Sequence, residues 1–365
     1  IKEPKKWPRV SFIIPCYNGQ ETVNETLDSI FKQEYQGAFD VVVYLSGDLD
    51  GYQFKHRKGL SILKGQGKVE KALAVNQAAK QVKGDFLFVV DADTCLDKQA
   101  LRLVILRFNK DKVGAVTTSR LVKENNFWSL LQGFEYVMTN ILLTSYNKLG
   151  STVGLHGCSM CFRKQAFNQV GGIKRLPAQD FDVALRLVEK DWQVVCEIKA
   201  KAFTLSPKFR KWTSQRFRWM RGFSLAILNH YKVFFAKPFG LFFTVIYGLM
   251  SIIYLANFFI SQSFFKSISY LFLTALGFNL PLVIVLGILT GFLGWAIYDR
   301  LILYVLYASL SLPYILYPYK LRDFLKAPLI FVYSLVYLPL FVLFNIFGII
   351  LALNDKIKKR ETIKW

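Results

Sequence analysis

The sequence contains few of the residues from which disulfide frameworks and zinc centres are built. Its 365 residues include five cysteines and three histidines. An odd number of cysteines cannot pair completely, and the Cys-x-x-Cys at Cys158 and Cys161 has no second half to complete the four ligands of structural zinc. The histidines, His56, His156 and His230, do not form a ligand set. We therefore expect reduced thiols and no structural zinc.

Acidic residues are also scarce, because 25 Asp and Glu stand against 47 Lys and Arg and leave a net charge of +22. This balance excludes an acidic or neutral cytosolic enzyme. The basic residues are scattered through the chain, and no zinc-finger, homeodomain or ribonucleoprotein spacing occurs, so we expect no nucleic-acid partner. An anionic substrate and an anionic bilayer surface explain the charge better.

The C-terminal third almost lacks charge. Only Lys266, Asp299 and Arg300 are charged between residues 238 and 319, and residues 327–353 carry no charge. Because about 20 apolar residues cross a bilayer, we expect four spans, near residues 239–261, 270–297, 301–319 and 328–351. Basic residues after the last span favour a cytosolic tail, and the opening residues 1–7 are typical of a basic juxtamembrane leader. The pattern predicts an integral membrane protein whose N-terminal domain is cytosolic.

The N-terminal part alternates short apolar runs with helical patterns. The runs predict strands at residues 10–15, 40–45, 61–63, 85–90 and 113–118. Helices are expected at 21–32, 69–82, 127–149, 183–189 and 208–231. Alternation of this kind predicts an α/β domain with a mostly parallel sheet, in which ligands bind beyond the carboxyl ends of the strands. The loops after Ile14, Leu45 and Val90 are therefore expected to line one crevice.

Two of the expected helices have features of membrane-interface helices. Residues 127–149 present a broad apolar face, which fits docking at the interface or, alternatively, a plain core helix. Residues 208–231 combine arginines with aromatic residues, a pattern typical of the headgroup level. The alternative for this second segment is an ordinary amphipathic helix packed on the sheet.

The strongest local signal for chemistry is Asp91-Ala92-Asp93, which follows an apolar strand. Two carboxylates at a loop mouth can bridge a divalent metal to a diphosphate, whereas the alternative is a turn with solvated carboxylates. Further along the chain, Asp180 precedes a helix. A carboxylate can act as a general base that takes a proton from a hydroxyl, and Asp182 is the next candidate for such a base.

Several short motifs occur in an order that is more specific than any one of them. They are Ile14-Pro15-Cys16-Tyr17-Asn18, Lys71 with Ala74-Val75-Asn76, Asp91-Ala92-Asp93, the 157–163 stretch leading to Gly171-Gly172, Gln179-Asp180, and Gln215-x-x-Arg218-Trp219. Together they resemble the membrane-embedded family 2 glycosyltransferases, which include cellulose, chitin and hyaluronan synthases and ceramide glucosyltransferase. The resemblance covers about residues 10–219 and the general layout of the C-terminal spans.

The resemblance implies a fold and its boundaries. A GT-A-like, mostly parallel sheet domain would occupy residues 1–207, and interface helices residues 208–237. A transmembrane region of about four helices would then occupy residues 238–353, followed by a basic cytosolic tail at 354–365.

The resemblance also implies a role for each motif residue. Asp180 would be the catalytic base, and Asp93 would hold Mg²⁺ or Mn²⁺ at the diphosphate. The residues expected to bind the donor nucleotide are Pro15, Tyr17, Ser46, Lys71 and Asp91. Those expected at the diphosphate and acceptor are Gln215, Arg218 and Trp219, where the guanidinium fork matches phosphate oxygens and the indole offers a stacking face for a sugar.

The sequence departs from the family pattern at Gln179, which replaces Glu, at Ala178, which replaces Thr, and at Ser46. The family usually has Asp-Asp-Gly-Ser after its second strand, and an ungapped match places Leu45-Ser46-Gly47-Asp48 there. Ser46 lacks the charge that normally contacts uracil, so we expect weaker discrimination for this base, with Asp48 or Asp50 as substitutes. His156, before the 157–163 stretch, is expected to be a satisfied structural histidine, with a place facing the acceptor as the alternative.

These features predict a metal-dependent inverting glycosyltransferase that moves a sugar from a nucleotide-diphosphate donor, expected to be a UDP-sugar, to a growing polysaccharide. The expected partners are the donor, a glycan or lipid acceptor, and membrane lipids. Transfer of a single sugar to a lipid is the alternative within this class. A membrane scaffold or transporter component with an inactive domain is the alternative from another class.

Overall fold

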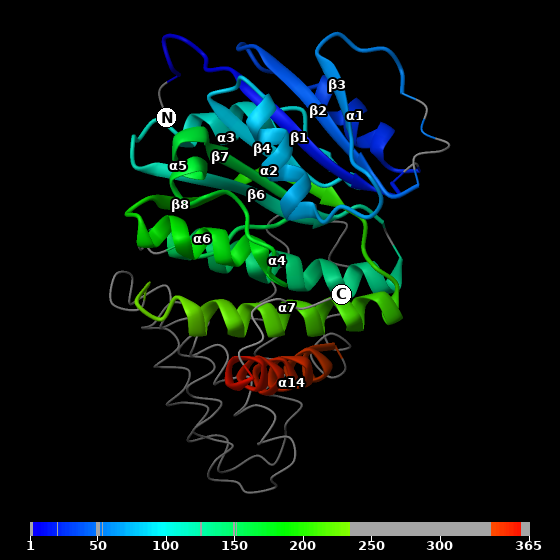
Figure 1. The fold of residues 1–365 in the computed structure, drawn as a ribbon, viewed down its shortest axis with the longest axis vertical. Helices are drawn as coiled ribbons and strands as arrows, with labels where there is room; N and C mark the ends of the chain where they lie inside the picture. The colour runs from blue at the N-terminus through cyan, green and yellow to red at the C-terminus, as the bar shows by residue number, and fades with distance from the viewer. Residues whose placement is uncertain are drawn as a thin grey trace, which may run out of the picture.

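The computed structural model describes residues 3–233, except 20, 49–51, 53, 125, 149 and 151, and residues 337–358. In this described part, eight strands form one sheet with the order β3-β2-β1-β4-β7-β6-β8-β5 (Figure 1). The strands are β1 (Val10–Tyr17), β2 (Phe39–Ser46), β3 (Leu60–Lys64), β4 (Phe86–Val90), β5 (Thr94–Leu96), β6 (Val113–Val122), β7 (Ser159–Arg163) and β8 (Gln193–Thr204).

The sheet is mixed rather than mostly parallel, which corrects the expectation from the sequence. Strands β1, β2, β3 and β4 pair in parallel, as do β6 and β8. Strand β7, however, runs antiparallel to both β4 and β6, and β5 runs antiparallel to β8. The apolar pattern predicts no strand at 157–163, yet most of this stretch forms the central strand that breaks the parallel order.

Helices cover both faces of the sheet. They are α1 (Val23–Phe31), α2 (Lys71–Gln81), α3 (Ala100–Arg107), α4 (Phe127–Lys148), α5 (Lys164–Gln169), α6 (Gln179–Glu189), α7 (Phe209–Asn229) and α14 (Leu338–Ile357). Successive side chains of β1 point to opposite faces, so Phe12 and Ile14 pack with α1 and α3 residues. Ile13 packs with residues of α2, α5 and α6. Burial on both faces explains why the first strands read as continuous apolar runs.

Helix α4 packs on β6 and β8. Leu131, Val137 and Leu143 are buried along it. Its broad apolar face is therefore covered by protein, as the core-helix alternative predicts.

Helix α7 lies in a further layer, where it contacts α6 on one side and α14 on the other (Figure 1). It is packed on helices, which differs from the alternative of an amphipathic helix on the sheet. Trp212 and Arg216 are completely buried in this layer. Arg216 also pairs with Glu135 of α4, so the buried side of α7 packs among α4, α6 and α14.

Helix α14 lies against α7 and crosses the boundary expected at residue 353. Arg221 of α7 donates two hydrogen bonds to the carboxylate of Asp355, at 2.5 and 2.7 Å. A Cβ atom at Gly348 would lie only 2.5 Å from Cβ of Met220, so the two helices approach closely. Residues 354–357 consequently belong to this packed helix.

The spans expected near residues 239–261, 270–297 and 301–319 lie outside the described residues, and so does the start of the span expected near 328–351. Within the part of the chain that the structure describes, no helix has both the length and the apolar character needed to cross a bilayer.

Candidate active site

The ends of β1 and β2 place three predicted donor-site residues at one edge of the sheet. Tyr17 is paired in register with Ser46, and Pro15 lies two residues earlier in β1. Tyr17 is 49% exposed, and the ammonium of Lys68 lies 5.8 Å from the centre of its ring. Ser46 is buried, and its hydroxyl donates a 3.4 Å hydrogen bond to the Val69 carbonyl. Tyr17 is therefore open to a ligand, whereas the Ser46 hydroxyl is engaged by the loop before α2.

Asp91 and Lys71 form an ion pair at the carboxyl end of β4. The ammonium of Lys71, in the first turn of α2, donates to Asp91 Oδ1 and also to the Gly157 carbonyl at 2.7 Å. Burial acts to lower the pKa of Lys71, but the charges of Asp91 and Asp180 and the hydrogen bond with Asp91 outweigh it, so the pKa is raised. Both side chains are partly exposed, so a ligand can reach the ion pair.

Asp93 lies next to this pair in a less favourable environment for charge. Burial, and secondarily the charge of Asp91, raises the pKa of Asp93 to about 6. A divalent cation would relieve this repulsion, and Mg²⁺ is commonly held by one or two carboxylates together with substrate phosphates. The described residues contain no group of three or more His, Cys, Asp or Glu suited to a metal ion. Asp91 and Asp93 are therefore two carboxylates of the kind that can hold such a cation.

Asp180 lies in the first turn of α6, which begins at Gln179 and hence earlier than the sequence predicts. Its Oδ2 atom accepts a 2.9 Å hydrogen bond from the Gly157 amide, and its Oδ1 atom accepts one of 3.0 Å from the Phe181 amide. A Cβ atom at position 157 would lie 2.7 Å from Asp180 Oδ2, so a larger residue there would displace this carboxylate. Because Asp180 remains partly exposed, it can still meet a substrate.

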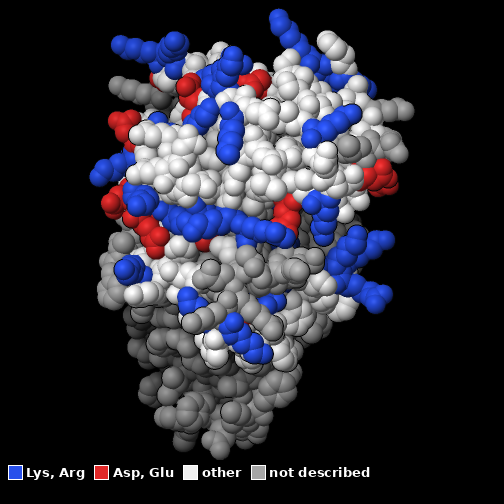
Figure 2. All heavy atoms as spheres, viewed as in Figure 1, with Lys and Arg blue, Asp and Glu red and all other residues white. Residues whose placement is uncertain are grey.

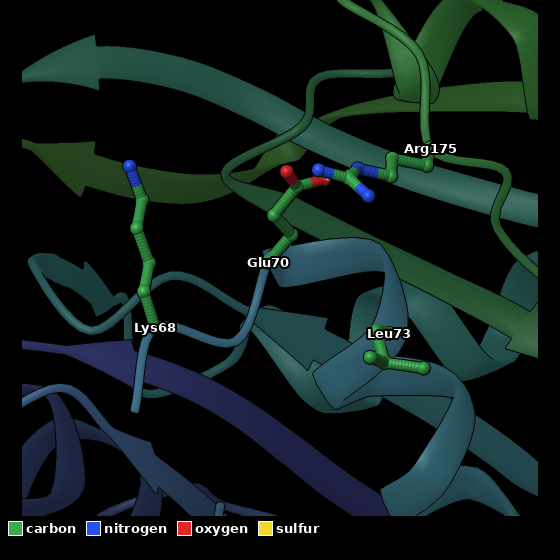
Figure 3. Close-up of a pocket in the computed structure, with 4 residues that line it drawn as sticks. All are labelled: Lys68, Glu70, Leu73 and Arg175. Atoms are coloured by element: carbon green, nitrogen blue, oxygen red, sulfur yellow. Dashed lines mark ion pairs between the residues drawn. The ribbon is translucent and has the colours of Figure 1, made fainter. Parts of the chain in front are cut away.

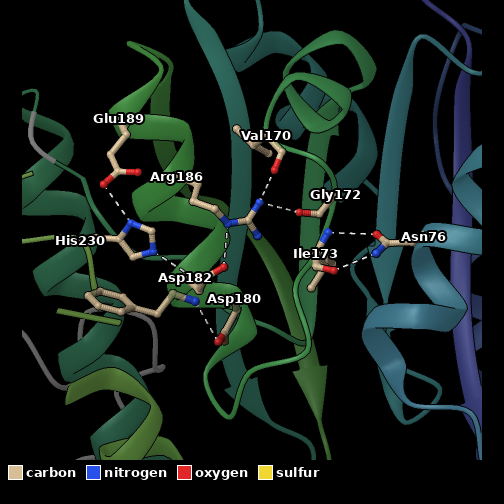
Figure 4. Close-up of polar contacts among 10 residues, drawn as sticks. Asn76, Val170, Gly172, Ile173, Asp180, Asp182, Arg186, Glu189 and His230 are labelled. Carbon is tan, nitrogen blue, oxygen red and sulfur yellow. Dashed lines mark hydrogen bonds and ion pairs between the residues drawn. The ribbon is translucent and has the colours of Figure 1, made fainter. Parts of the chain in front are cut away.

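Asp182, the alternative base, is engaged elsewhere (Figure 4). It is 1% exposed, and its carboxylate accepts a hydrogen bond from Arg186 Nε at 2.8 Å and pairs with His230 Nε2 at 3.0 Å. Burial acts to raise the pKa of Asp182, but these two partners lower it. His230 also contacts Glu189 through Nδ1 at 2.9 Å. Asp182 therefore ties α6 to the end of α7 and does not face a substrate.

The loop that leads to Asp180 is fixed against α2 (Figure 4). Asn76 of α2 donates to the Ile173 carbonyl at 2.8 Å and accepts from the Ile173 amide at 2.9 Å. Gly172 allows this contact, because it adopts φ +73° and a Cβ there would collide with Asn76 Oδ1. One helix thus carries Lys71 and also holds the loop before the candidate base.

Arg218 of α7 lies near the same carboxylates. Its Nη1 atom donates to the Pro177 carbonyl at 3.3 Å. Burial lowers the pKa of Arg218, while the charges of Asp180 and Asp91 act to raise it. The guanidinium thus lies within electrostatic reach of both carboxylates.

Gln215 and Trp219, on either side of Arg218 in α7, are both held by Arg216. Gln215 accepts a hydrogen bond from Arg216, whose guanidinium lies 4.4 Å from the centre of the Trp219 ring. The guanidinium of Arg120 lies 5.0 Å from the same ring.

The structure therefore brings Lys71, Asp91, Asp93, Asp180 and Arg218 together. Pro15, Tyr17 and Ser46 lie at the neighbouring strand ends, whereas Gln215 and Trp219 are linked to the rest through α7.

Several residues of this region are not singled out by the sequence. In the sequence, Gly157 is only one member of a motif. In the structure, its carbonyl binds Lys71 and its amide binds Asp180. No motif in the sequence marks Arg120 or Glu135 as functional, because Arg120 lies within strand β6 and Glu135 within helix α4. His156 is buried, burial lowers its pKa well below the usual value, and its ring nitrogens have no hydrogen-bond partner among the described residues. It is thus buried as expected but not satisfied.

A pocket of about 220 Å³ lies beside this site (Figure 3). Lys68, Glu70, Leu73 and Arg175 line it, and Arg175 Nε pairs with Glu70 Oε2 at 2.5 Å. Glu70 immediately precedes Lys71, so the pocket opens at the start of α2. None of the carboxylates of the candidate site lines it.

Comparison with known families decides the class of the protein. The model described as "Glycosyltransferase like family 2" matches residues 8–222, which contain every motif of the site. The chain belongs to this family. Its GT-A-like α/β domain is the part that carries the match.

Curated relatives in the family include poly-beta-1,6-N-acetyl-D-glucosamine synthases. That of Staphylococcus epidermidis is 29% identical over 224 residues, covering 58% of this chain and 54% of the relative. That of Staphylococcus aureus strain COL is 26% identical over 257 residues, covering 67% and 62%. The chain therefore spans little more than half the length of the curated relatives it matches.

A solved structure has the same fold. A mannosyltransferase from Pyrobaculum calidifontis, in complex with GDP-Man and Mn²⁺, aligns with a TM-score of 0.59 at 19% identity. The alignment covers 97% of this chain and 89% of that protein. At this identity the likeness establishes the fold alone.

Proposed function

We propose that this protein is an inverting glycosyltransferase that moves a sugar from a nucleotide-diphosphate donor to a growing polysaccharide at a membrane. The observation that carries the proposal is the continuous path of contacts from Asp91 through Lys71 and Gly157 to Asp180. This path fixes the position of Asp91, proposed for the donor side, relative to the partly exposed Asp180, proposed for the acceptor side. Membership of family 2 supports the same chemistry.

In this proposal Asp180 removes the proton of the acceptor hydroxyl as the oxygen attacks the anomeric carbon. The bond from that carbon to the diphosphate breaks on the opposite side, which inverts the configuration. Lys71 and Arg218 carry positive charge beside the carboxylates and would stabilise the departing diphosphate. Basic side chains also outnumber acidic ones on the face shown in Figure 2, which favours an anionic donor.

Asp91 and Asp93 would hold Mg²⁺ or Mn²⁺. When bound, the cation would neutralise charge on the diphosphate. The raised pKa of Asp93 supports this assignment, because it marks a carboxylate whose charge lacks compensation. The mannosyltransferase with the same fold was solved with Mn²⁺.

The relatives named as poly-beta-1,6-N-acetyl-D-glucosamine synthases support a polymeric product. We take a UDP-sugar as the donor, with Tyr17 open for the base. The buried Ser46 offers uracil at most a neutral hydroxyl, so discrimination against other bases is expected to be weak.

We further propose that the protein works at a membrane with its transferase domain in the cytosol. The exposed apolar side chains of α14 support this location, and they are Phe347, Ile350, Leu351, Leu353 and Ile357. Lys356 and Lys358 lie on either side of Ile357, so the apolar surface lies beside positive charge, as is typical of a helix at the lipid headgroups.

The proposal is tested by incubating the purified chain in lipid vesicles with radiolabelled UDP-N-acetylglucosamine, UDP-glucose and GDP-mannose, followed by product sizing. We expect a polymer from one UDP-sugar with inverted anomeric configuration. A single labelled sugar in the lipid extract would assign the protein to lipid glycosylation instead. The absence of transfer from every donor would favour the inactive scaffold.

A further inference from the structure

Arg216 is one of two residues of the Gln215–Trp219 segment to which the family motif gives no role, yet it is the most buried residue of the segment. It has no exposed surface. Burial acts to lower the pKa of Arg216, but the charge of Glu135 outweighs it and raises the pKa. A buried charge of this kind needs a partner with good geometry. Glu135 is therefore central to how the segment is held.

Glu135 of α4 holds Arg216 from the side of the sheet. Its Oε2 atom accepts hydrogen bonds from Arg216 Nε at 3.1 Å and Nη2 at 2.6 Å. Tyr337, just before α14, donates to the same oxygen, and Trp212 Nε1 donates to the Tyr337 hydroxyl at 2.6 Å. The Glu135 Oε2 atom thus connects α4 by hydrogen bonds to α7 and to the start of α14.

The rest of the Arg216 guanidinium contacts Gln215 and Trp219 within α7. Nη1 donates to Gln215 Oε1, and the guanidinium lies over Trp219, 4.4 Å from the ring centre. A cation over an indole face is attractive and favours one ring orientation. Glu135 therefore fixes a group that touches both residues proposed to meet the acceptor.

We propose that Glu135 is a positioning residue for acceptor transfer, acting through Arg216 on Gln215 and Trp219. The inference rests on the proposed function, because it assigns these two residues to the acceptor side. Among the described residues, the side-chain hydrogen bonds of Glu135 come from Arg216 and Tyr337. None involves Asp91, Asp93 or Asp180, so substitution of Glu135 is expected to leave donor binding intact.

The ion pair between Arg221 of α7 and Asp355 of α14 provides a matched control. Asp355 of α14 is also buried and also pairs with an α7 arginine, Arg221, but the hydrogen bonds of this pair do not involve Gln215 or Trp219. Asp355→Asn therefore removes a comparable buried carboxylate without touching the acceptor segment. A merely structural role for Glu135 predicts similar behaviour for Asp355→Asn and Glu135→Gln.

The first measurement compares donor binding with transfer in the full chain. For Glu135→Gln we expect UDP affinity within about twofold of wild type by calorimetry and transfer about tenfold slower or more per folded molecule. Misplacement of a positioned group by up to about 1 Å has effects of this size or larger. Asp355→Asn is expected to retain transfer. Equal loss in both variants, or normal transfer in Glu135→Gln, would overturn the proposal.

The second measurement does not depend on activity. In protein labelled with 5-fluorotryptophan, the Trp219 resonance is assigned from its loss in Trp219→Phe. We expect it to shift in Glu135→Gln and stay in place in Asp355→Asn. An unmoved resonance in Glu135→Gln would contradict the proposal. If wild type transfers no sugar, the proposed function fails, while this measurement still decides the role of Glu135.

The conservative variant Glu135→Asp covers the case in which Glu135→Gln does not fold. It keeps the charge on a shorter side chain, so we expect intermediate transfer and a smaller displacement of the Trp219 resonance. Wild-type transfer together with an unmoved resonance in Glu135→Asp would overturn the proposal.

Discussion

Lys71 and Asp180 bind the two backbone groups of a single residue, Gly157. The Lys71 ammonium donates to its carbonyl at 2.7 Å, and Asp180 accepts from its amide at 2.9 Å. In the proposed mechanism, the donor side and the acceptor side of the site are thereby joined through one residue. The proposal therefore assigns the spacing between Lys71 and Asp180 to the turn before β7.

Gly157→Ala is predicted to disrupt this arrangement. The new methyl group would lie 2.7 Å from Asp180 Oδ2 and displace the carboxylate. We expect transfer to fall by about 10²-fold, because a displacement of about 1 Å at a reacting group has effects of this size. Transfer assays and thermal melting check this prediction.

Gly150→Ala is the control for this change. No atom of the residues that the structure describes lies within 4 Å of a Cβ at position 150, although its φ of +67° is unfavourable for alanine. We therefore expect Gly150→Ala to lower the melting temperature slightly and to retain transfer. Wild-type transfer in Gly157→Ala would show that the close contact with Asp180 is unimportant.

Lys71→Met is predicted to weaken donor binding. The change removes the ammonium that pairs with Asp91 and leaves the start of α2 without its charge. A hydrogen bond to a charged group contributes about 1.5–3 kcal/mol, so UDP should bind roughly 10- to 100-fold more weakly. Calorimetry measures this effect. Lys80→Met, an exposed change on the same helix, should leave the affinity unchanged. Similar UDP affinities in wild type, Lys71→Met and Lys80→Met would show that Lys71 does not bind the donor.

Removal of divalent cations is predicted to abolish transfer. Without a cation, the diphosphate would lie beside the carboxylates of Asp91 and Asp93 with only Lys71 and Arg218 to offset their charge. Excess EDTA should stop the reaction, added Mg²⁺ or Mn²⁺ should restore it, and Asp93→Ala should resist restoration. Asp111→Ala changes an exposed carboxylate and should respond as wild type does. Full turnover in EDTA would exclude a required cation.

The contacts of His230 predict a pH-dependent contribution to stability. Burial acts to lower the pKa of His230, but Asp182 and Glu189 outweigh it and raise the pKa above 6.5. A raised folded-state pKa stabilises the fold fully below the unfolded value and loses this effect as pH rises through the folded value. The melting temperature of wild type should therefore exceed that of His230→Gln most at about pH 6 and least at about pH 9. A difference that grows with pH would contradict this assignment.

Apolar runs make the first half of the fold predictable. Strands β1, β2 and β4 are buried along most of their length, so each appears in the sequence as a short run of apolar residues, which is typical of a buried strand. Strand β7 is harder to predict, because its Ser159–Arg163 sequence lies within a motif and its partner β4 lies far away in the chain. Local patterns do not report such distant partners.

The candidate site is predictable where chemistry is tied to a strand end, as for Asp91, and less so where burial decides the role. Asp180 and Asp182 are two residues apart and chemically identical in the sequence. Only the packed α6 shows that Asp182 is occupied by Arg186 and His230. For the same reason, the pairing of Glu135 with Arg216 across 81 positions gives no signal in the sequence.

The most direct test of the account is the comparison of Asp180→Asn with Asp182→Asn in one preparation, with UDP binding and sugar transfer measured together. The account predicts that Asp180→Asn remains folded, binds UDP as wild type does and loses transfer by about 10²–10⁴-fold, the usual effect of removing a general base. Asp182→Asn should instead lower the melting temperature. Wild-type transfer in Asp180→Asn would place the base elsewhere and contradict the account.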